Sequence, residues 1–91
     1  PLVVAKGVDE IAEKIKEIAR ESEVPVIPLP PLARSLYYTT DLDCEIPRGL
    51  FKAVAQVLAW VMGMKSFKEG KSKQRPRDLD MNLPIPDELK F

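Results

Sequence analysis

The chain has 91 residues, with 14 basic and 14 acidic side chains and a formal net charge of zero. This length allows one small domain, and the balanced charge argues against nucleic-acid binding driven by bulk electrostatics. The single cysteine, Cys44, excludes an internal disulfide and fits a reducing compartment. Without a signal peptide or a run of about 18 apolar residues, the chain is not expected to span a membrane itself.

The first predicted elements are a short strand and an amphipathic helix. Residues 2–5 are apolar and rich in β-branched side chains, which is typical of a buried strand. From residue 8 onwards apolar residues recur every three or four positions and predict a helix with one apolar face. A second short strand is expected at residues 24–27, where Pro25 and Pro28 limit its length. A strand, a helix and a second strand predict a right-handed βαβ unit with parallel strands.

Two further helices are predicted after this unit. The Pro30-Pro31 pair opens a short helix, because proline suits the first helical turn. Residues 39–46 are expected to form a polar connection. The longest helix starts at Pro47 and is apolar around much of its circumference as far as Met62, so we expect it to be well buried.

The C-terminal part changes character. Residues 66–80 are charged and poor in apolar side chains, which predicts a flexible linker, and the basic run within 65–77 is typical of a solvated tail. Residues 81–91 regain hydrophobicity, which predicts docking on this chain or on a partner. We therefore divide the chain into a domain at 1–65 and a flexible, partly docking tail at 66–91.

The predicted fold class is α/β, a small sheet covered by helices. This chain would supply a βαβ unit, two further helices and the flexible C-terminal tail. Two short strands make only a marginal sheet by themselves. We therefore expect the chain to pack against strands from a segment that precedes residue 1, whether covalently joined or cleaved.

The chain offers little for catalysis or metal binding. It has no histidine, no cysteine pair and no glycine-rich phosphate loop. Asp41, Asp43 and Glu45 alternate, but they lack the glycine and the distal glutamate of a calcium loop. We therefore predict no enzymatic activity for this chain, and no metal or other cofactor.

Four segments, in order, carry a resemblance to a known family. They are VVAKG at 3–7, IKEIA at 15–19, PPLARSLY at 30–37, and the helix that follows EIP within 45–59. Together they resemble the FlhB/YscU family of type III secretion export-switch proteins. The tail at 82–89 resembles the C-terminal extension of the flagellar members, so the flagellar branch is favoured over the injectisome branch.

The resemblance implies a function for the whole protein. Family members sit in the bacterial inner membrane, and their cytoplasmic domain helps the export gate change from rod and hook substrates to filament substrates. Members cleave themselves at an Asn-Pro-Thr-His loop, which this chain does not contain, so no catalytic residue is assigned here. We expect the fragment on the cytoplasmic face of the inner membrane, joined to the membrane only through the missing N-terminal part.

The resemblance also suggests a switch surface and its partners. The expected partners are the preceding segment of the same protein, other export-gate proteins and export substrates, but no nucleic acid. Arg34 is the residue expected to present a charge, while the prolines shape the turn. The candidate partner-binding residues are Lys6, Gly7, Pro30, Pro31, Leu32, Ala33 and Arg34.

Three alternatives stay open on the sequence alone. The chain could be an injectisome homologue of the same family, or a structural adaptor without effect on export order. The third alternative is a small RNA-binding α/β module of the L7Ae type, anchored by its basic tail. Against it, residues 1–62 carry seven basic and nine acidic side chains and no basic patch beside a glycine-bearing loop.

Overall fold

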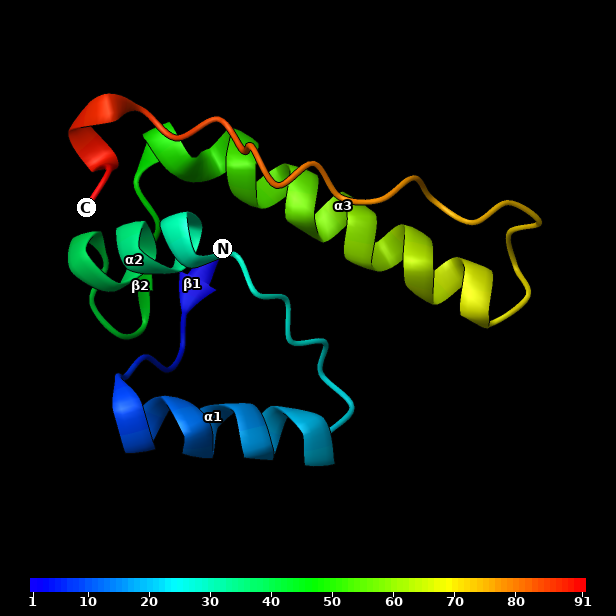
Figure 1. Cartoon of the computed structure of the whole chain (residues 1–91), viewed down its shortest axis with the longest axis horizontal. Helices are drawn as coiled ribbons and strands as arrows, with labels where there is room; N and C mark the ends of the chain where they lie inside the picture. Colours follow the sequence, from blue (N-terminus) through cyan, green and yellow to red (C-terminus); the bar gives the residue numbers. More distant parts are fainter.

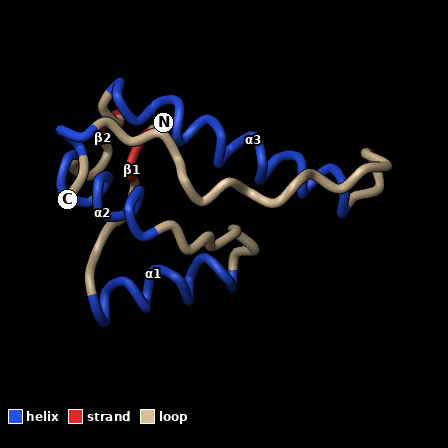
Figure 2. The backbone as a smooth tube through the Cα atoms, turned by 45° about the horizontal axis from the view of Figure 1, so that its top comes forward, coloured by secondary structure: helices blue, strands red, loops and turns tan.

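The computed structural model describes all 91 residues and contains three helices and a two-stranded sheet (Figure 1). Two short 3-10 helices, η1 (Arg48–Leu50) and η2 (Asp87–Leu89), lie before the last helix and near the C-terminus. Both ribbon and tube views place α2 and the sheet between α1 on one side and α3 on the other (Figure 1, Figure 2). The main elements in chain order are β1 (Leu2–Val3), α1 (Asp9–Glu21), α2 (Pro30–Thr39), β2 (Cys44–Glu45) and α3 (Phe51–Lys68).

The α/β class with a small sheet and covering helices is confirmed, but the parallel βαβ unit is wrong. β1 pairs with β2 in antiparallel register, with Leu2 opposite Glu45. Residues 24–27, expected to be the second strand, form a connection outside the sheet. Their prolines lack amide hydrogens, and the Val24 amide instead donates to the carbonyl oxygen of Ala19 at 2.8 Å, which closes α1.

The second strand lies instead within residues 39–46, where the sequence predicts only a polar connection. A tight turn precedes it, in which Asp43 has a φ of 62°, a left-handed conformation that aspartate tolerates better than most residues. The Asp43 amide then donates to the carbonyl oxygen of Val3 at 2.6 Å. A strand this short and polar gains its structure from a distant partner, so no local pattern reveals it.

The core is small and lies where the start of α2, the start of α3 and the tail meet. Leu50 is fully buried there, and Leu36 and Leu89 are partly buried around it. This core therefore joins three segments that are far apart in the sequence. Its six buried apolar residues are Leu29, Leu32, Ile46, Leu50, Ala53 and Leu83.

Most of α1 and α3 lies outside this core, so the expectation of a well-buried long helix is wrong for this chain. α1 buries no residue and α3 buries only Ala53. Leu58 on α3 is 47% exposed and Ile11 on α1 is 61% exposed. The physical reason is the arrangement itself, since the two helices lie on opposite sides of the molecule (Figure 1).

α3 is also longer than its apolar pattern. It continues past Gly63 to Lys68, so residues 66–68 are helical rather than part of a linker. The stretch Arg48–Lys68 is long and apolar enough to cross a membrane by length and composition, with a mean hydropathy of 1.2. A single such helix is weak evidence for a span, and the burial of Leu50 and Ala53 in the protein core accounts for its apolar start.

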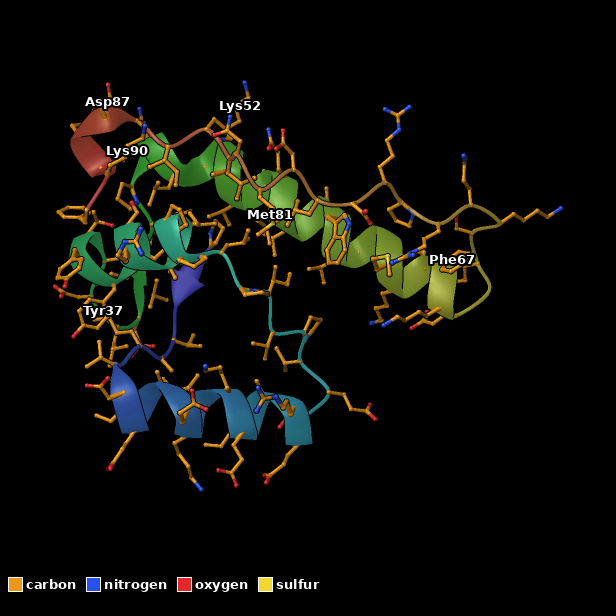
Figure 3. The ribbon with its side chains drawn as sticks, viewed as in Figure 1. Tyr37, Lys52, Phe67, Met81, Asp87 and Lys90 are labelled. Atoms are coloured by element: carbon orange, nitrogen blue, oxygen red, sulfur yellow. The ribbon has the colours of Figure 1, made fainter.

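The tail returns along α3 to the core (Figure 1). The Trp60 indole N–H donates to the carbonyl oxygen of Arg77 at 2.9 Å, and Leu83 is 9% exposed. Leu89 packs onto Gly49, where an added Cβ would lie only 2.7 Å from the leucine Cδ1. In the stick view, the labelled Met81 lies on the path along α3 before the tail reaches η2 (Figure 3).

We predict that Leu83 is the residue that holds the tail. Leu83→Ala should lower the free energy of unfolding by about 2 kcal/mol, because a buried leucine is truncated, and should speed amide exchange across residues 84–91. Met81→Ala is the matched control. Met81 is 59% exposed, so its truncation should change stability by less than about 0.5 kcal/mol. Urea unfolding and amide exchange, in a protein that also carries the segment preceding residue 1, measure both variants, and equal effects would contradict this packing.

Candidate functional site

The proline turn at the start of α2 is fixed in two ways. Pro30 and Pro31 occupy the first helical turn, where the fixed φ of proline suits the helix and its missing N–H leaves no bond unmade. Leu29 and Leu32, on either side of the pair, are 6% and 5% exposed. The turn is therefore anchored in the core, and the exposed side chains that follow it point in a fixed direction.

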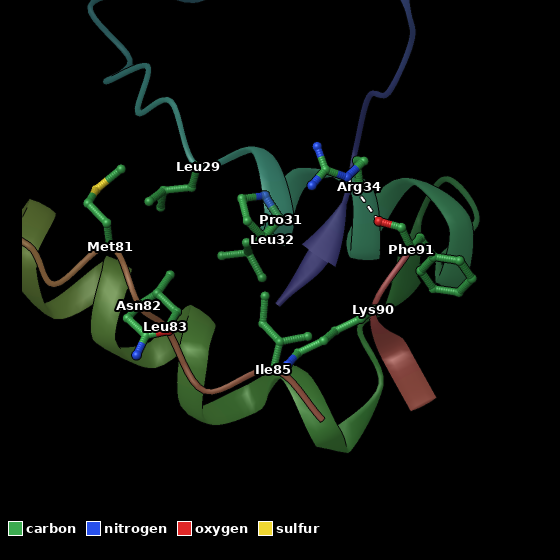
Figure 4. A pocket seen from close by; sticks show the side chains of 10 residues that line it. All are labelled: Leu29, Pro31, Leu32, Arg34, Met81, Asn82, Leu83, Ile85, Lys90 and Phe91. Carbon is green, nitrogen blue, oxygen red and sulfur yellow. Dashed lines mark hydrogen bonds between the residues drawn. The ribbon is translucent and has the colours of Figure 1, made fainter. Parts of the chain in front are cut away.

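Arg34 is the charged group that this turn presents. Its Nε donates to the main-chain carbonyl oxygen of Phe91 at 3.0 Å (Figure 4). The ring of Phe91 also lies 5.2 Å from that of Tyr38, between centroids. No Asp or Glu side chain lies within ion-pair distance of the Arg34 guanidinium. Its contact is with a main-chain oxygen of the tail rather than with an acidic side chain.

A groove of about 550 Å³ lies between the turn and the tail (Figure 4). One wall comes from Pro31 and Leu32, and the other from Leu83 and Ile85. Arg34 and Lys90 add positive charge at its edge, although Lys90 pairs with Asp87 at 3.1 Å. A groove with apolar walls and a cationic edge suits an extended segment that carries both apolar and acidic groups.

Lys6 has a different task from the one that the sequence suggests. Its Nζ donates to the carbonyl oxygens of Tyr37 at 3.0 Å and Thr40 at 2.9 Å. Asp41 lies 3.9 Å from the same nitrogen. These carbonyls end α2, and a cation is favourable at a helix C-terminus. Lys6 therefore ties the strand β1 region to the end of α2 and presents little charge outward.

Gly7 is required by close approach. A Cβ at this position would overlap the side chain of Ile11, with 2.7 Å to the isoleucine Cβ. The chain here turns from β1 into α1, and a larger residue would push the first turn of the helix away. Gly7 therefore shapes the entry to α1.

The predicted site residues thus fall into two places. Lys6 and Gly7 line a groove of about 430 Å³, together with Ala33. Pro31, Leu32 and Arg34 line the other groove, beside the tail. α2 contributes residues to both grooves, whereas Lys6 and Gly7 lie before α1, so the residues expected to form one switch surface do not share one pocket.

Sequence reasoning missed the contacts that the tail makes with the turn. The hydrophobic recovery at residues 81–91 indicated docking, but not its place. The bond from Arg34 to Phe91 uses a main-chain carbonyl, which leaves no trace in residue types. The Lys6 contacts were hidden for the same reason.

The acidic side chains of α1 form an exposed face away from these grooves. Lys16 donates to Glu13 at 2.7 Å, and this hydrogen bond, with the charge of Lys16, lowers the pKa of the Glu13 carboxyl below its ordinary value. Lys14 pairs with Glu17 at 3.9 Å. Such short-range pairs on a solvated helix indicate no catalytic pair.

Comparison with known sequences gives one consistent result. A sequence model of the FlhB HrpN YscU SpaS family matches residues 1–61. This chain is 44% identical, over all 91 of its residues, to the flagellar biosynthetic protein FlhB of Salmonella typhimurium. It has the same identity, over the same length, to FlhB of Escherichia coli K12. FlhB of Aquifex aeolicus is 48% identical over 65 residues, 71% of this chain.

The chain is only part of the length of these relatives. It spans 23% of the Salmonella and Escherichia proteins and 19% of the Aquifex protein. Among solved structures, the cytoplasmic domain of FlhB from Shewanella putrefaciens matches with a TM-score of 0.90 and 50% identity. That match covers 96% of this chain and 67% of the Shewanella chain.

Fold and sequence therefore agree. The family model covers more than half of the chain. The alignment with the flagellar relatives extends over the whole of this chain and so includes the tail that packs on α3. The chain belongs to the FlhB HrpN YscU SpaS family and is most like its flagellar members.

Proposed function

We propose that this chain is a working part of the flagellar type III protein export apparatus, at the cytoplasmic face of the bacterial inner membrane. In this role it controls the change from rod and hook substrates to filament substrates. The Salmonella and Escherichia relatives align with this chain over its whole length and are named flagellar biosynthetic proteins. Their names support the flagellar branch over an injectisome homologue. The chain contains no Asn-Pro-Thr-His sequence, so we assign it no catalytic residue.

The rigid turn with an exposed arginine is the observation that carries this proposal. Leu29 and Leu32 anchor the turn, and two prolines remove backbone freedom from it. A partner that binds Arg34 therefore orders little that is not already ordered, which favours binding. Guanidinium also recognises carboxylates and carbonyls with defined direction. The groove beside it accommodates an extended segment of another export protein or of a substrate.

The same proposal requires a second segment that completes the domain. Val24 and Val26, in the connection between α1 and α2, are 53% and 41% exposed, and Leu58 on α3 is 47% exposed. Burying such apolar surface is favourable by roughly 25 cal/mol per Å². About a third of the Shewanella domain lies outside this chain. We propose that the preceding segment of the same protein covers these faces, with strands that pair along residues 24–27.

We predict that Arg34→Ala separates switching from folding. The side chain is exposed and its one hydrogen bond is near solvent, so stability should change by less than about 1 kcal/mol. Export of filament-type substrates, or association of the cleaved halves, should fall clearly. The measurements are an export assay scored for hook and filament substrates, and a melting curve.

The control for this variant is Arg48→Ala, which removes an exposed arginine of η1 that does not line the groove beside the turn. It should leave both export classes unchanged. Replacing Pro30 and Pro31 by alanine should loosen the turn and give a milder version of the Arg34→Ala defect. Normal switching in the arginine and proline variants would remove the turn from the mechanism, and a large loss of stability in Arg34→Ala would make it a structural residue.

A second prediction concerns completion of the fold. Residues 1–91 alone should lack a sharp cooperative thermal transition, because too little apolar surface is buried. Adding the preceding segment of the protein should restore the transition and slow amide exchange at Val26 and Ile27. Well-dispersed NMR signals and cooperative melting for residues 1–91 alone would contradict it.

A further inference from the structure

A basic surface lies at the end of the molecule farthest from the proline turn at the start of α2. We call it the basic tip. Within residues 65–77 there are six basic side chains and one acidic side chain, Glu69. All six basic side chains are exposed, and they are Lys65, Lys68, Lys71, Lys73, Arg75 and Arg77.

A chain reversal turns this linear run into a surface. Gly70, with a φ of 75°, ends α3 in a conformation that suits glycine. The Lys71 amide donates to the carbonyl oxygen of Ser66 at 2.9 Å, so the chain folds back at once. Further on, Pro76 lies against Gly63, where an added Cβ would be 2.9 Å from the proline Cγ. The returning segment therefore lies alongside the end of α3 (Figure 1).

Most of this charge is not neutralised inside the protein. Lys71 pairs with Glu69 at 3.1 Å, and the other five basic side chains form no ion pair. Exposed Asp78 and Asp80 follow the basic run directly, and further acidic residues lie on the exposed face of α1 at Asp9, Glu10, Glu13 and Glu17. The stretch 65–77 itself still carries a local excess of positive charge.

Apolar side chains accompany the charges. Met62 is 68% exposed and Phe67, labelled in Figure 3 at the end of α3, is 36% exposed. Phe67 lies between Ser66 and Lys68 in the last turn of the helix. Cations that flank exposed apolar groups on a helix end suit an interface where phosphates lie next to hydrocarbon.

We propose that the basic tip docks on the surface of a membrane rich in anionic phospholipids. Lys and Arg of the tip bind headgroup phosphates, and Phe67 enters the boundary between headgroups and acyl chains. This contact goes beyond the switch function and does not depend on it. It is also additional to the membrane connection that the sequence analysis expects only through the missing N-terminal part.

The composition of the tip favours lipid over nucleic acid. Single-stranded RNA is held by bases that stack on exposed aromatic rings along a basic groove. Here Trp60 is partly buried and its indole N–H already bonds Arg77, which leaves Phe67 as the one exposed ring at the tip.

The test uses the whole cytoplasmic domain that carries this chain, because the Shewanella domain was solved as a separate piece. Binding is measured by flotation with vesicles of phosphatidylcholine alone, and of phosphatidylcholine mixed with phosphatidylglycerol. We expect binding to the mixed vesicles only, weakened by salt. Trp60 lies beside the tip, so brominated acyl chains should quench its fluorescence in the unmodified protein. Absence of binding or of quenching would overturn the proposal.

Two matched variants locate the contact. Lys73→Gln with Arg75→Gln should weaken binding roughly 10- to 30-fold, since each surface cation contributes about fivefold. Lys14→Gln with Lys16→Gln removes the same charge from α1 and should weaken binding less than about twofold. Equal losses in the two variants would show non-specific attraction and overturn the proposal.

The remaining arms separate lipid from other phosphates. Phe67→Ser should weaken vesicle binding several-fold while keeping its salt dependence, because only the apolar part is lost. Glycerol phosphate should not displace the vesicles, which distinguishes a lipid surface from a free-phosphate site. Binding to a short single-stranded RNA that is tighter than binding to vesicles, with no effect of Phe67→Ser on the vesicles, would assign the tip to nucleic acid instead. Melting curves check that every variant is folded.

Discussion

The constraint on which this structure depends is the anchoring of the proline turn between two buried leucines. Leu29 and Leu32 enter the core on either side of Pro30 and Pro31, and the fully buried Leu50 brings the start of α3 to the same place. α2 therefore begins at a fixed point and in a fixed direction. At its other end, Lys6 binds the last carbonyls of the helix and ties it to β1. Because both of its ends are held, α2 is a rigid element, and the sheet, the tail and Arg34 are positioned relative to it.

Sequence patterns predict the parts of this chain that local chemistry decides. The apolar stripe predicts α1, the proline pair predicts the start of α2, and the exposed Arg34 follows from the turn. The pairing of β1 with Cys44–Glu45 could not be predicted, because it depends on contact across some 40 residues and on a left-handed Asp43. Likewise, Arg34 and Lys6 bind main-chain carbonyls, and a carbonyl is present at every residue. Residue types therefore indicated the site residues, but not the main-chain oxygen atoms that they bind.

The prediction of a parallel strand at residues 24–27 is wrong for a physical reason that concerns the surroundings of this segment. Those residues have the apolar, β-branched character of a strand, but no strand of this chain pairs with them. The exposed apolar faces of α1 and α3 make the same point, since a stable domain of this size buries more than eight residues. A domain completed by another segment has a stability linked to the binding of that segment. Any event that loosens such a segment would therefore also affect α2, which begins at the proline turn.

The two functional surfaces lie at opposite ends of one helix. α3 has 18 residues, and a helix of that number is about 27 Å long. Ala53 in its first turn is buried in the core beside the proline turn, and its last turn carries the basic tip. Pro76 against Gly63 and Arg77 against Trp60 hold the returning chain along the helix, which stiffens this spacing. If the tip rests on the membrane, α3 sets how far from the lipid surface Arg34 meets its partners, and tilting of the helix changes that distance without changing the fold.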